Sequence, residues 1–283
     1  MPELPEVETV RLGLERYLVG HKIVDIKLNT PKVFTGEVRD IIGGKVIGVR
    51  RFAKVLSIDL DNGFSVIVHI KLTGQLIYRG ANLKNPPQLS RKVVGGIEGK
   101  HTHVVFELDK GSHLYFNDVR RFGWVKILKT DEVAKNRFIG KLGPEPFKDL
   151  TLEKFREIIG KSKTAIKVVL MDQTKIGGIG NIYANDALLL SKIHPKRAAN
   201  SLSDKESEDL YSNILKVLKK GLESGGASEL SFVTVEGTEG KYQQHFVAYG
   251  KQGKLCPVCG KEKIVKFSVG GRGTYYCPNC QKL

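Results

Sequence analysis

Four cysteines near the C-terminus constrain the fold of this chain more than any other feature of its sequence. They form two close pairs, Cys256-x2-Cys259 and Cys277-x2-Cys280, with 17 residues between the pairs. This spacing is typical of a four-cysteine zinc site, in which each pair makes a tight turn around a tetrahedral ion. Since no secretory signal is recognisable, metal ligation is favoured over disulfide pairing. Four thiolates leave no open coordination position, so we expect one structural Zn²⁺.

The residues between the two cysteine pairs predict a β-hairpin. Ile264–Val269 and Thr274–Cys277 are the two strands, and they flank the turn sequence Gly270-Gly271-Arg272-Gly273. This arrangement places Arg272 at the tip of the hairpin. An arginine in a turn is most often simply solvated, but a zinc-braced hairpin can also aim a guanidinium at a phosphate.

The charge of the chain favours a polyanionic partner. The sequence has 46 Lys and Arg against 30 Asp and Glu, which gives a formal net charge of +16. Residues 241–283 contain eight of the basic residues and one acidic residue. Nucleic acid is the commonest partner of a protein with such an excess. There is no run of about 18 apolar residues, so we expect no membrane association.

The N-terminal sequence Met1-Pro2-Glu3-Leu4-Pro5-Glu6 suggests a nucleophile. The small neighbour Pro2 favours removal of Met1, which leaves a secondary amine at the N-terminus. An α-amino group titrates near about 7.7–8.0, so part of it is unprotonated at neutral pH and can attack a sugar aldehyde carbon. Glu3 and Glu6 lie three residues apart, on one face of a helix. The simpler alternative is an acidic first helical turn with Pro5 near its start.

Hydrophobic periodicity predicts a helix followed by a β-rich region. Apolar residues at Val7, Val10, Leu14 and Leu18 predict an amphipathic helix over residues 3–18. Residues 22–128 then show short strand-like runs separated by turns, which favours an antiparallel sandwich or barrel. The clearest runs are Lys45–Val49, Val55–Leu60, Phe64–Ile70, His103–Leu108 and His113–Phe116.

Helical patterns dominate between residues 151 and 225. Thr151 and Thr164 are predicted N-caps, and Ser203 with Glu206 predicts a capping box. A glycine-rich turn leads into a predicted helix over Ile182–Ser191. Residues 223–242 are rich in Gly, Ser and Thr and are expected to form a mobile loop. The predicted domains are 1–130, a linker at 131–150, 151–235 and 236–283.

Several residues suit contact with DNA. Arg120 and Phe122 lie on a turn, where a guanidinium and a ring can enter a duplex, and Leu72 is a second apolar side chain on a turn. Lys54 interrupts the strand-like run Phe52–Leu60, which is costly unless the lysine has a partner or a task. Asn181 begins a helix, where backbone amides can hold a phosphate. Taken alone, each of these residues is weak evidence, because a leucine in a turn usually serves packing and a lysine such as Lys54 usually extends to solvent.

Together these residues resemble the formamidopyrimidine-DNA glycosylases over almost the full length. The shared motifs are Pro2-Glu3-Leu4-Pro5-Glu6-Val7-Glu8-Thr9, His69-x-x-Leu72-Thr73-Gly74, His101-x-His103-Val104, Asp118-Val119-Arg120-Arg121-Phe122-Gly123, Leu142-Gly143-Pro144-Glu145-Pro146, Lys163-Thr164-x-Ile166-Lys167, Gly178-Ile179-Gly180-Asn181-Ile182-Tyr183 and the four-cysteine finger. The resemblance implies an α+β multidomain fold. Its parts are an N-terminal helix with an antiparallel β-sandwich, a helix–two-turns–helix domain and a C-terminal zinc-finger β-hairpin.

The resemblance also implies a function, namely base-excision repair of oxidised purines in double-stranded DNA, with cleavage of the abasic site by β,δ-elimination. Pro2 is the implied nucleophile, Glu3 the proton donor with Glu6 in support, and Lys54 and Arg272 assist elimination. The implied DNA-binding residues are Leu72, His101, Arg120, Phe122, Lys163 and Asn181. The protein is expected to be a monomer in the cytoplasm of a bacterium, bound to nucleoid DNA.

Two alternatives stay open. An endonuclease VIII-type enzyme shares the scaffold and the chemistry of Pro2 and Glu3 but prefers oxidised pyrimidines; the run Leu4–Thr9 favours the purine enzymes. A non-catalytic DNA-binding protein with the same fold has no need of a trimmed N-terminal proline.

Overall fold

The computed structural model describes residues 1–283, and the chain divides into two compact units. Unit 1 comprises Met1–Lys141 and Leu222–Gln243, and unit 2 comprises Leu142–Gly221 and Gln244–Leu283. Each unit therefore combines two separate segments of the chain. None of the helices has both the length and the apolar character needed to cross a bilayer.

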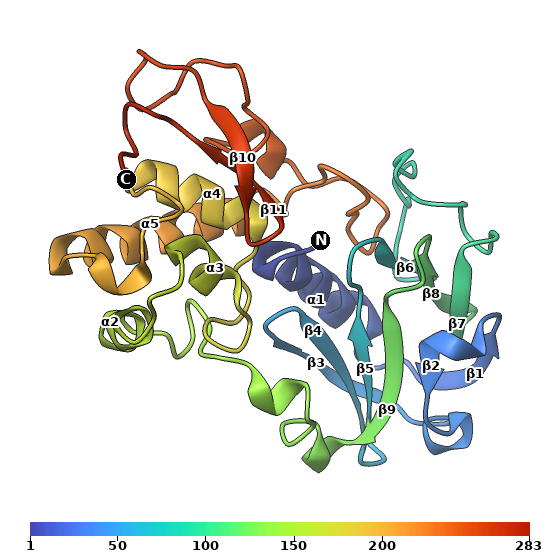
Figure 1. Ribbon diagram of the computed structural model, residues 1–283. Helices are drawn as coiled ribbons and strands as arrows, with labels where there is room; N and C mark the ends of the chain where they lie inside the picture. The colour runs from blue at the N-terminus through green and yellow to red at the C-terminus, as the bar shows by residue number, and fades with distance from the viewer. The chain divides into compact units, whose positions relative to one another are not determined.

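Unit 1 begins with helix α1 (Leu4–Leu18), as the periodicity predicts. Its four predicted apolar positions are all buried in the main hydrophobic core of the unit. Figure 1 shows α1 alongside the strands of this unit. The helix is therefore an integral part of the core, and its first turn is fixed in place by that packing.

Two sheets share this core with α1 and form the predicted sandwich. One sheet has the strand order β1 (Ile23–Leu28), β7 (Thr102–Leu108), β8 (Ser112–Asp118) and β6 (Gly74–Arg79). The other has the order β2 (Phe34–Thr35), β9 (Trp124–Lys129), β5 (Phe64–His69), β4 (Val55–Leu60) and β3 (Val46–Phe52). All neighbouring strands are antiparallel except the short pair β2–β9. Residues of both sheets line one cluster of buried side chains.

The segment 222–243 differs from its prediction. It is irregular after the end of the helix that enters it, but Phe232, Val233 and Val235 are buried in the cores of unit 1. A Cβ added at Gly13 of α1 would lie 2.3 Å from a methyl carbon of Val235, so the two segments pack tightly. We expected this stretch to be divided between a helical domain and a zinc finger. The apolar residues within it place it in unit 1 instead, because their burial there removes them from water.

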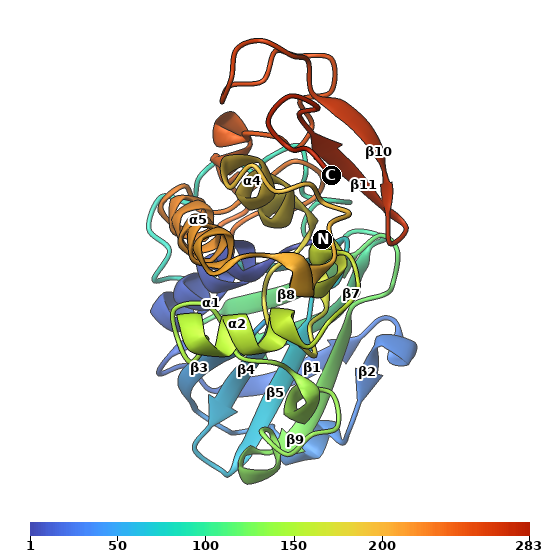
Figure 2. The same ribbon diagram turned by 60° about the vertical axis from the view of Figure 1, so that its left-hand side comes forward.

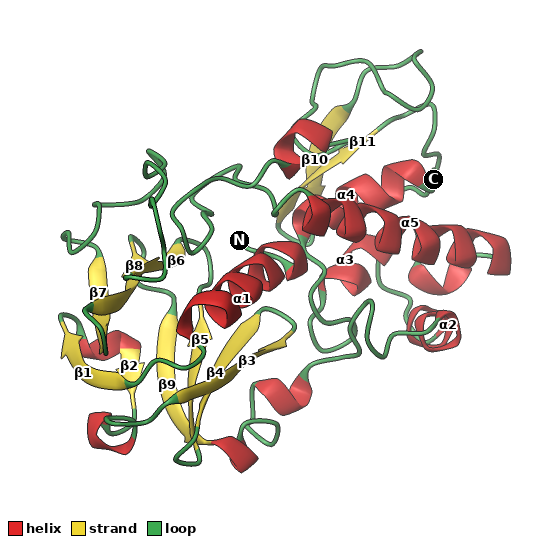
Figure 3. Cartoon of the chain, turned by 180° about the vertical axis from the view of Figure 1, so that it is seen from behind, coloured by secondary structure: helices red, strands yellow, loops and turns green.

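The helices of unit 2 are α2 (Leu152–Gly160), α3 (Ile166–Met171), α4 (Asn181–Leu190) and α5 (Asp204–Glu223), whose last two residues fall in unit 1. Figure 3 shows them as coiled ribbons in red. The predicted caps at Thr151 and at Ser203 with Glu206 are confirmed. The prediction for Thr164 is wrong, because the N-cap of α3 is Ala165. Ala165 has a non-helical backbone, with a ψ of 131°, and forms a bridge with Ala198, so the helix begins one residue later.

The predicted hairpin is present in unit 2 as β10 (Val265–Val269) and β11 (Arg272–Tyr276), which Figure 2 shows as a pair of arrows. Its turn is only two residues long, since Val269 lies opposite Arg272 in the register. Gly270 and Gly271 both have positive φ, at 56° and 71°, as a type I′ turn requires. Arg272 is therefore the first residue of β11 rather than part of the turn.

Candidate active site

The N-terminal candidates Pro2, Glu3 and Glu6 lie together at the start of α1, and all three are buried. Glu3 is only 2% exposed. The backbone N–H of Glu3 donates to Glu6 Oε2 at 2.8 Å, which closes the first helical turn. Glu6 Oε1 accepts from the backbone N–H of Ala227 at 2.7 Å. The Glu6 carboxylate therefore fixes the backbone beside Pro2 to the segment 222–243.

The approach of that segment to Glu6 depends on a glycine. Gly226 has a φ of +81°, and a Cβ added there would lie 2.9 Å from Glu6 Cγ. Any other residue would be strained in this conformation and would also collide with the carboxylate side chain. The contact joins residues 221 positions apart, so no local pattern of the sequence reveals it.

Lys54 lies in the two-residue connection between β3 and β4, next to Ala53, which has a φ of 50°. The prediction of a lysine within a continuous strand is therefore wrong, because a positive φ cannot continue a strand. The Lys54 residue is only 4% exposed. Its turn is held by Arg51, which donates to the Ala53 carbonyl at 2.9 Å and to Glu8 Oε2 at 2.7 Å.

Arg51 thus ties the turn that carries Lys54 to the helix that follows Pro2. Sequence reasoning missed Arg51 and Glu8 as site residues, although Glu8 belongs to the N-terminal motif. The only signal in the sequence is that Glu8, an acidic residue of this motif, has no predicted role. A buried or half-buried carboxylate next to a candidate nucleophile calls for a cationic partner.

His69 ends β5 and provides a neutral polar group on the same unit. Burial lowers its pKa from 6.5 to about 3, and the nearby ammonium groups of Lys71 and Lys54 act in the same direction. Its Nδ1 accepts the backbone N–H of Lys71 at 3.1 Å. The ring packs edge-on against Trp124 and Phe138. His69 is therefore an uncharged imidazole at physiological pH.

Four predicted DNA-binding residues of unit 1 lie on its loops. Arg120 and Phe122 are exposed, and the Arg120 guanidinium lies 4.7 Å from the centroid of the Phe122 ring. Leu72 is half-buried between β5 and β6. His101 precedes β7, and its carbonyl accepts the backbone N–H of Asp118 at 2.9 Å. All four are accessible to a ligand, which is a condition for their predicted role.

The other three candidates, Lys163, Asn181 and Arg272, lie on unit 2. Lys163 is exposed before α3. Asn181 begins α4, and its Nδ2 donates to the carbonyl of Gly273 at 3.1 Å. The Nζ of Lys167, which is completely buried, donates to the same carbonyl at 3.0 Å. These two contacts fix the strand residue next to Arg272, whose own side chain is exposed.

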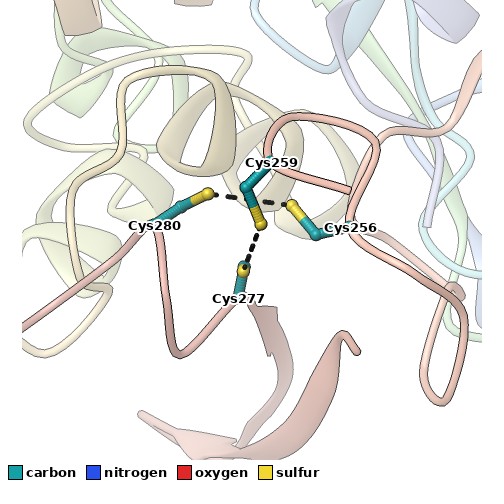
Figure 4. Close-up of side chains that lie close together, drawn as sticks. All are labelled: Cys256, Cys259, Cys277 and Cys280. Atoms are coloured by element: carbon teal, nitrogen blue, oxygen red, sulfur yellow. Dashed lines mark hydrogen bonds between the residues drawn. The ribbon is translucent and has the colours of Figure 1, made fainter. Parts of the chain in front are cut away.

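The four cysteines fit a zinc ion. Their sulfur atoms all lie within 4.8 Å of one another and point to a common centre, as Figure 4 shows. The Cys256–Cys280 and Cys259–Cys277 sulfur pairs are 3.9 and 3.7 Å apart. A tetrahedral ion with Zn–S bonds of about 2.3 Å sets its sulfurs about 3.8 Å apart, so the geometry matches. Backbone N–H groups of Glu262 and Lys261 lower the pKa of Cys259 to about 6, whereas burial raises the pKa of the Cys277 and Cys280 thiols.

Known proteins match the chain along its whole length. The formamidopyrimidine-DNA glycosylase N-terminal domain matches residues 1–125, the H2TH domain of the same family matches 142–232, and a zinc finger found in FPG and IleRS matches 253–283. The formamidopyrimidine-DNA glycosylases of Pelotomaculum thermopropionicum and Heliobacterium modesticaldum are 39% and 38% identical, with 100% of each chain covered.

Solved structures agree with the sequence matches. A complex of a Lactococcus lactis FPG mutant with Fapy-dG containing DNA has a TM-score of 0.87 and 35% identity, and the match covers 100% of both chains. A complex of Lactococcus lactis Fpg with an abasic site containing DNA has the same TM-score and identity and covers 99% of this chain and 100% of that one.

The fold, the cysteine cluster and these matches define a DNA glycosylase of base-excision repair with a structural zinc site. The chain belongs to the formamidopyrimidine-DNA glycosylase family. The mixed α+β fold with an H2TH domain and a C-terminal zinc finger is thereby confirmed. The roles of the individual site residues stay predictions.

Proposed function

We propose that this protein removes oxidised purines, 8-oxoguanine and formamidopyrimidines, from duplex DNA and then cleaves the abasic site with Pro2 as its nucleophile. The observation that supports this proposal most is the N-terminal segment. Pro2 and Glu3 are buried side by side, and the Glu6 carboxylate holds the backbone beside them with two hydrogen bonds to N–H groups. A segment fixed in this way can present an amine and a carboxyl group to one carbon atom.

In the proposed first step, the Pro2 amine attacks C1′ after Met1 has been removed. The bond from C1′ to the base breaks, and the base leaves with a proton. Glu3 donates a proton to the ring oxygen O4′, which opens the sugar. The amine loses its hydrogen and becomes an iminium joined to C1′. A positioned acid contributes roughly 10²–10⁴ to such a rate.

In the proposed later steps, two eliminations cut the strand on both sides of the sugar. Loss of a proton from C2′ breaks the C3′–O bond, and Lys54 assists this step and holds a neighbouring phosphate. Loss of a further proton from C4′ breaks the C5′–O bond, and Arg272 binds the phosphate that leaves. Water then hydrolyses the iminium and frees Pro2. Each phosphate departs with the electrons of the broken C–O bond.

The proposed partner is double-stranded DNA that contains a damaged base, bound by one copy of the protein. Solved complexes of the relatives hold Fapy-dG containing DNA and abasic-site DNA, which supports this choice. Leu72, Arg120 and Phe122 would fill the gap left by the everted nucleotide. His101, Lys163 and Asn181 would contact the DNA backbone. We expect the protein to act on the nucleoid in the cytoplasm of a bacterium.

Borohydride trapping tests the nucleophile. The purified protein is incubated with four duplexes that carry 8-oxoguanine, a formamidopyrimidine, an oxidised pyrimidine or an abasic site. We expect a covalent adduct with the purine lesions and the abasic site, because borohydride reduces the iminium to a stable amine. Pro2→Gly should largely abolish the adduct, whereas Pro31→Gly, at an exposed position of unit 1, should leave it intact.

Three outcomes would contradict the proposal. Undiminished trapping by protein that retains Met1 would exclude Pro2 as the nucleophile. Preferential excision of the oxidised pyrimidine would assign the chain the specificity of the endonuclease VIII-type alternative. DNA binding with no excision of any lesion would favour a non-catalytic DNA-binding protein.

A further inference from the structure

The two turns that carry the proposed insertion residues are neighbours in unit 1. Ile70–Thr73 connects β5 to β6, and Val119–Gly123 connects β8 to β9. Each turn crosses from one sheet of the sandwich to the other. The flanking strands are paired, with Gly74 opposite Asp118 in one sheet and His69 opposite Trp124 in the other. The two turns therefore lie next to each other, at the same end of the sandwich.

Asp118 is the centre of this region. It ends β8 and is completely buried. Its Oδ2 accepts the backbone N–H of Gly123 at 2.7 Å, and its Oδ1 accepts the backbone N–H of Arg120 at 3.1 Å. Its carbonyl accepts from His103 Nε2 at 2.6 Å. The carboxylate thus spans the whole turn that presents Arg120 and Phe122.

Thr73 extends this network to the other turn. Its hydroxyl donates to Asp118 Oδ1 and accepts the backbone N–H of Arg120 at 3.1 Å. One hydroxyl group is therefore used as donor and as acceptor between the two turns. Thr73 directly follows Leu72, so the same contact fixes the backbone of all three insertion residues.

The backbone of the second turn is strongly constrained, while its side chains are exposed. Arg121 has a φ of 55°, which is unfavourable for a residue other than glycine. A Cβ added at Gly123 would lie 2.8 Å from the Phe116 ring and 3.0 Å from the His69 carbonyl. Phe122 is nevertheless 53% exposed. A rigid turn with an exposed ring is suited to entering a base stack, because little conformational entropy is lost on insertion.

We propose that Thr73 and Asp118 form a latch that joins the Leu72 turn and the Arg120–Phe122 turn into one rigid insertion element. Both are positioning residues, since neither has to touch the damaged base. The inference rests on the proposed function, in which Leu72, Arg120 and Phe122 enter the duplex. The latch makes the two turns enter together. Without it, the Leu72 turn keeps the hydrogen bond from the Ser231 hydroxyl to the Leu72 carbonyl, at 3.2 Å, but is no longer joined to the Arg120–Phe122 turn.

The test compares hydroxyl deletion with hydroxyl retention in the full zinc-loaded protein. Thr73→Val removes the hydroxyl at nearly constant volume, and Thr73→Ser keeps it. Thr130→Val is the matched control, because it deletes a threonine hydroxyl that bonds Ser65 at the far end of β9. Two substrates are used, a duplex with 8-oxoguanine next to 2-aminopurine and a single-stranded oligonucleotide with an abasic site. In the single strand no base pair has to be opened, so insertion into a duplex is not required.

We expect Thr73→Val to slow single-turnover excision from the duplex roughly tenfold, as expected for loss of a hydrogen bond to a charged group. The rate of the 2-aminopurine fluorescence change, which reports base unstacking, should fall by a similar factor. Borohydride trapping on the single-stranded abasic site should be unchanged, and Thr73→Ser should restore duplex excision. Asp118→Asn, whose amide nitrogen cannot accept a hydrogen bond, should show a larger loss of the same kind.

The proposal is overturned if Thr73→Val matches the wild type on the duplex, or if it loses both substrates alike. Equal losses in Thr73→Val and Thr130→Val would also overturn it, since they would reflect general destabilisation. These outcomes all differ from failure of the proposed function, in which the wild-type protein itself forms no trapped adduct on either substrate.

Discussion

The N-terminal site of unit 1 and the zinc hairpin of unit 2 are held in opposite ways. The four cysteines of the hairpin span only 24 positions, and one ion is enough to organise them. At the N-terminus, Glu6 binds Ala227 at a separation of 221 positions, and Glu8 binds Arg51 at a separation of 43. A metal site of local ligands can be recognised from the spacing of its residues. A site built from carboxylates and distant backbone groups exists only after the chain has folded.

Zinc removal should show this difference most strongly. Chelation or Cys256→Ser should abolish DNA binding, because the free energy of zinc binding is what folds a small metal module. Unit 1 should keep its structure, since none of its residues is a zinc ligand. The single tryptophan, Trp124 in β9, reports on unit 1 by fluorescence, and a gel-shift assay reports DNA binding.

The chelator saturated with zinc is the control for that experiment. If free chelator changes the Trp124 fluorescence and the zinc-saturated chelator does not, the structure of unit 1 depends on the metal. The contrast between the two regions would then be lost.

Substitution of Glu3 should have the next largest effect. Glu3→Gln keeps the size of the side chain but removes the proposed acid, so excision of 8-oxoguanine should fall by roughly 10²–10⁴. Cleavage of a preformed abasic site should be largely retained, because an abasic sugar opens to its aldehyde without the enzyme's acid and no base has to leave. Both rates can be measured on the same gel, with the exposed Glu37→Gln as a matched control. Equal losses on the two substrates would argue against Glu3 as the acid that protonates the sugar during excision.

The Arg272→Lys substitution tests whether Arg272 binds phosphate through the planar shape of its guanidinium or only through its positive charge. A guanidinium can bind two phosphate oxygens in a fixed plane, and an ammonium cannot. We therefore expect excision and δ-elimination to fall by about tenfold or more, with nonspecific DNA affinity nearly unchanged, since a pair of charge-assisted hydrogen bonds is lost. The comparison is single-turnover excision against binding of undamaged duplex, with Arg39→Lys on the exposed surface of unit 1 as control. A parallel loss of both would make Arg272 one positive charge among many.

A further expected effect concerns the stability of unit 1 in mild acid, with no change in the site itself. The pKa of His69 is lowered from 6.5 to about 3 by burial and by Lys71 and Lys54. Below pH 6.5 the unfolded chain binds a proton that the folded chain does not, so stability present above this pH is lost as the pH falls toward 3. Between pH 7 and pH 5 this amounts to about 2 kcal/mol.

Urea unfolding followed by Trp124 fluorescence measures this loss, because the tryptophan ring lies 5.7 Å from the His69 ring. His69→Asn should flatten the pH dependence, whatever its effect on stability at pH 7. His113→Asn, a second histidine of the same unit, should not. An unchanged slope in the His69 variant would show that the imidazole is not buried as a neutral group.

Much of the fold could be predicted because short-range patterns specify it. The spacing of Val7, Val10, Leu14 and Leu18 predicted the helix, and short strand-like runs separated by turns predicted most strands of the sandwich. The cysteine spacing predicted the zinc site and the hairpin between its pairs. Each of these features depends on residues a few positions apart, whose geometry is set by the 3.6- or 2-residue repeat or by a tight turn.

The errors have the opposite cause. Lys54 was placed within a strand, although its run is broken by the positive φ of Ala53. The local sequence predicts Thr164 as a cap, but a bridge to Ala198 keeps Ala165 out of the helix. Residues 223–242 are irregular after the end of α5, as predicted, but the core of unit 1 buries apolar side chains of this segment, which its composition does not reveal. In each case a long-range contact or a single backbone angle outweighed the local preference.

The sequence by itself determined the family and the metal ligands, and it named the side chains that are proposed to do the chemistry. Only the tertiary structure decided how those side chains are held. It joined Glu6 to Ala227, Arg51 to Glu8, and Thr73 to Asp118. Such pairings have no periodic signature, because they form where strands and loops distant in the chain are brought together by burial of a shared core. A buried carboxylate must find hydrogen-bond donors, and only the folded backbone determines which donors are within reach.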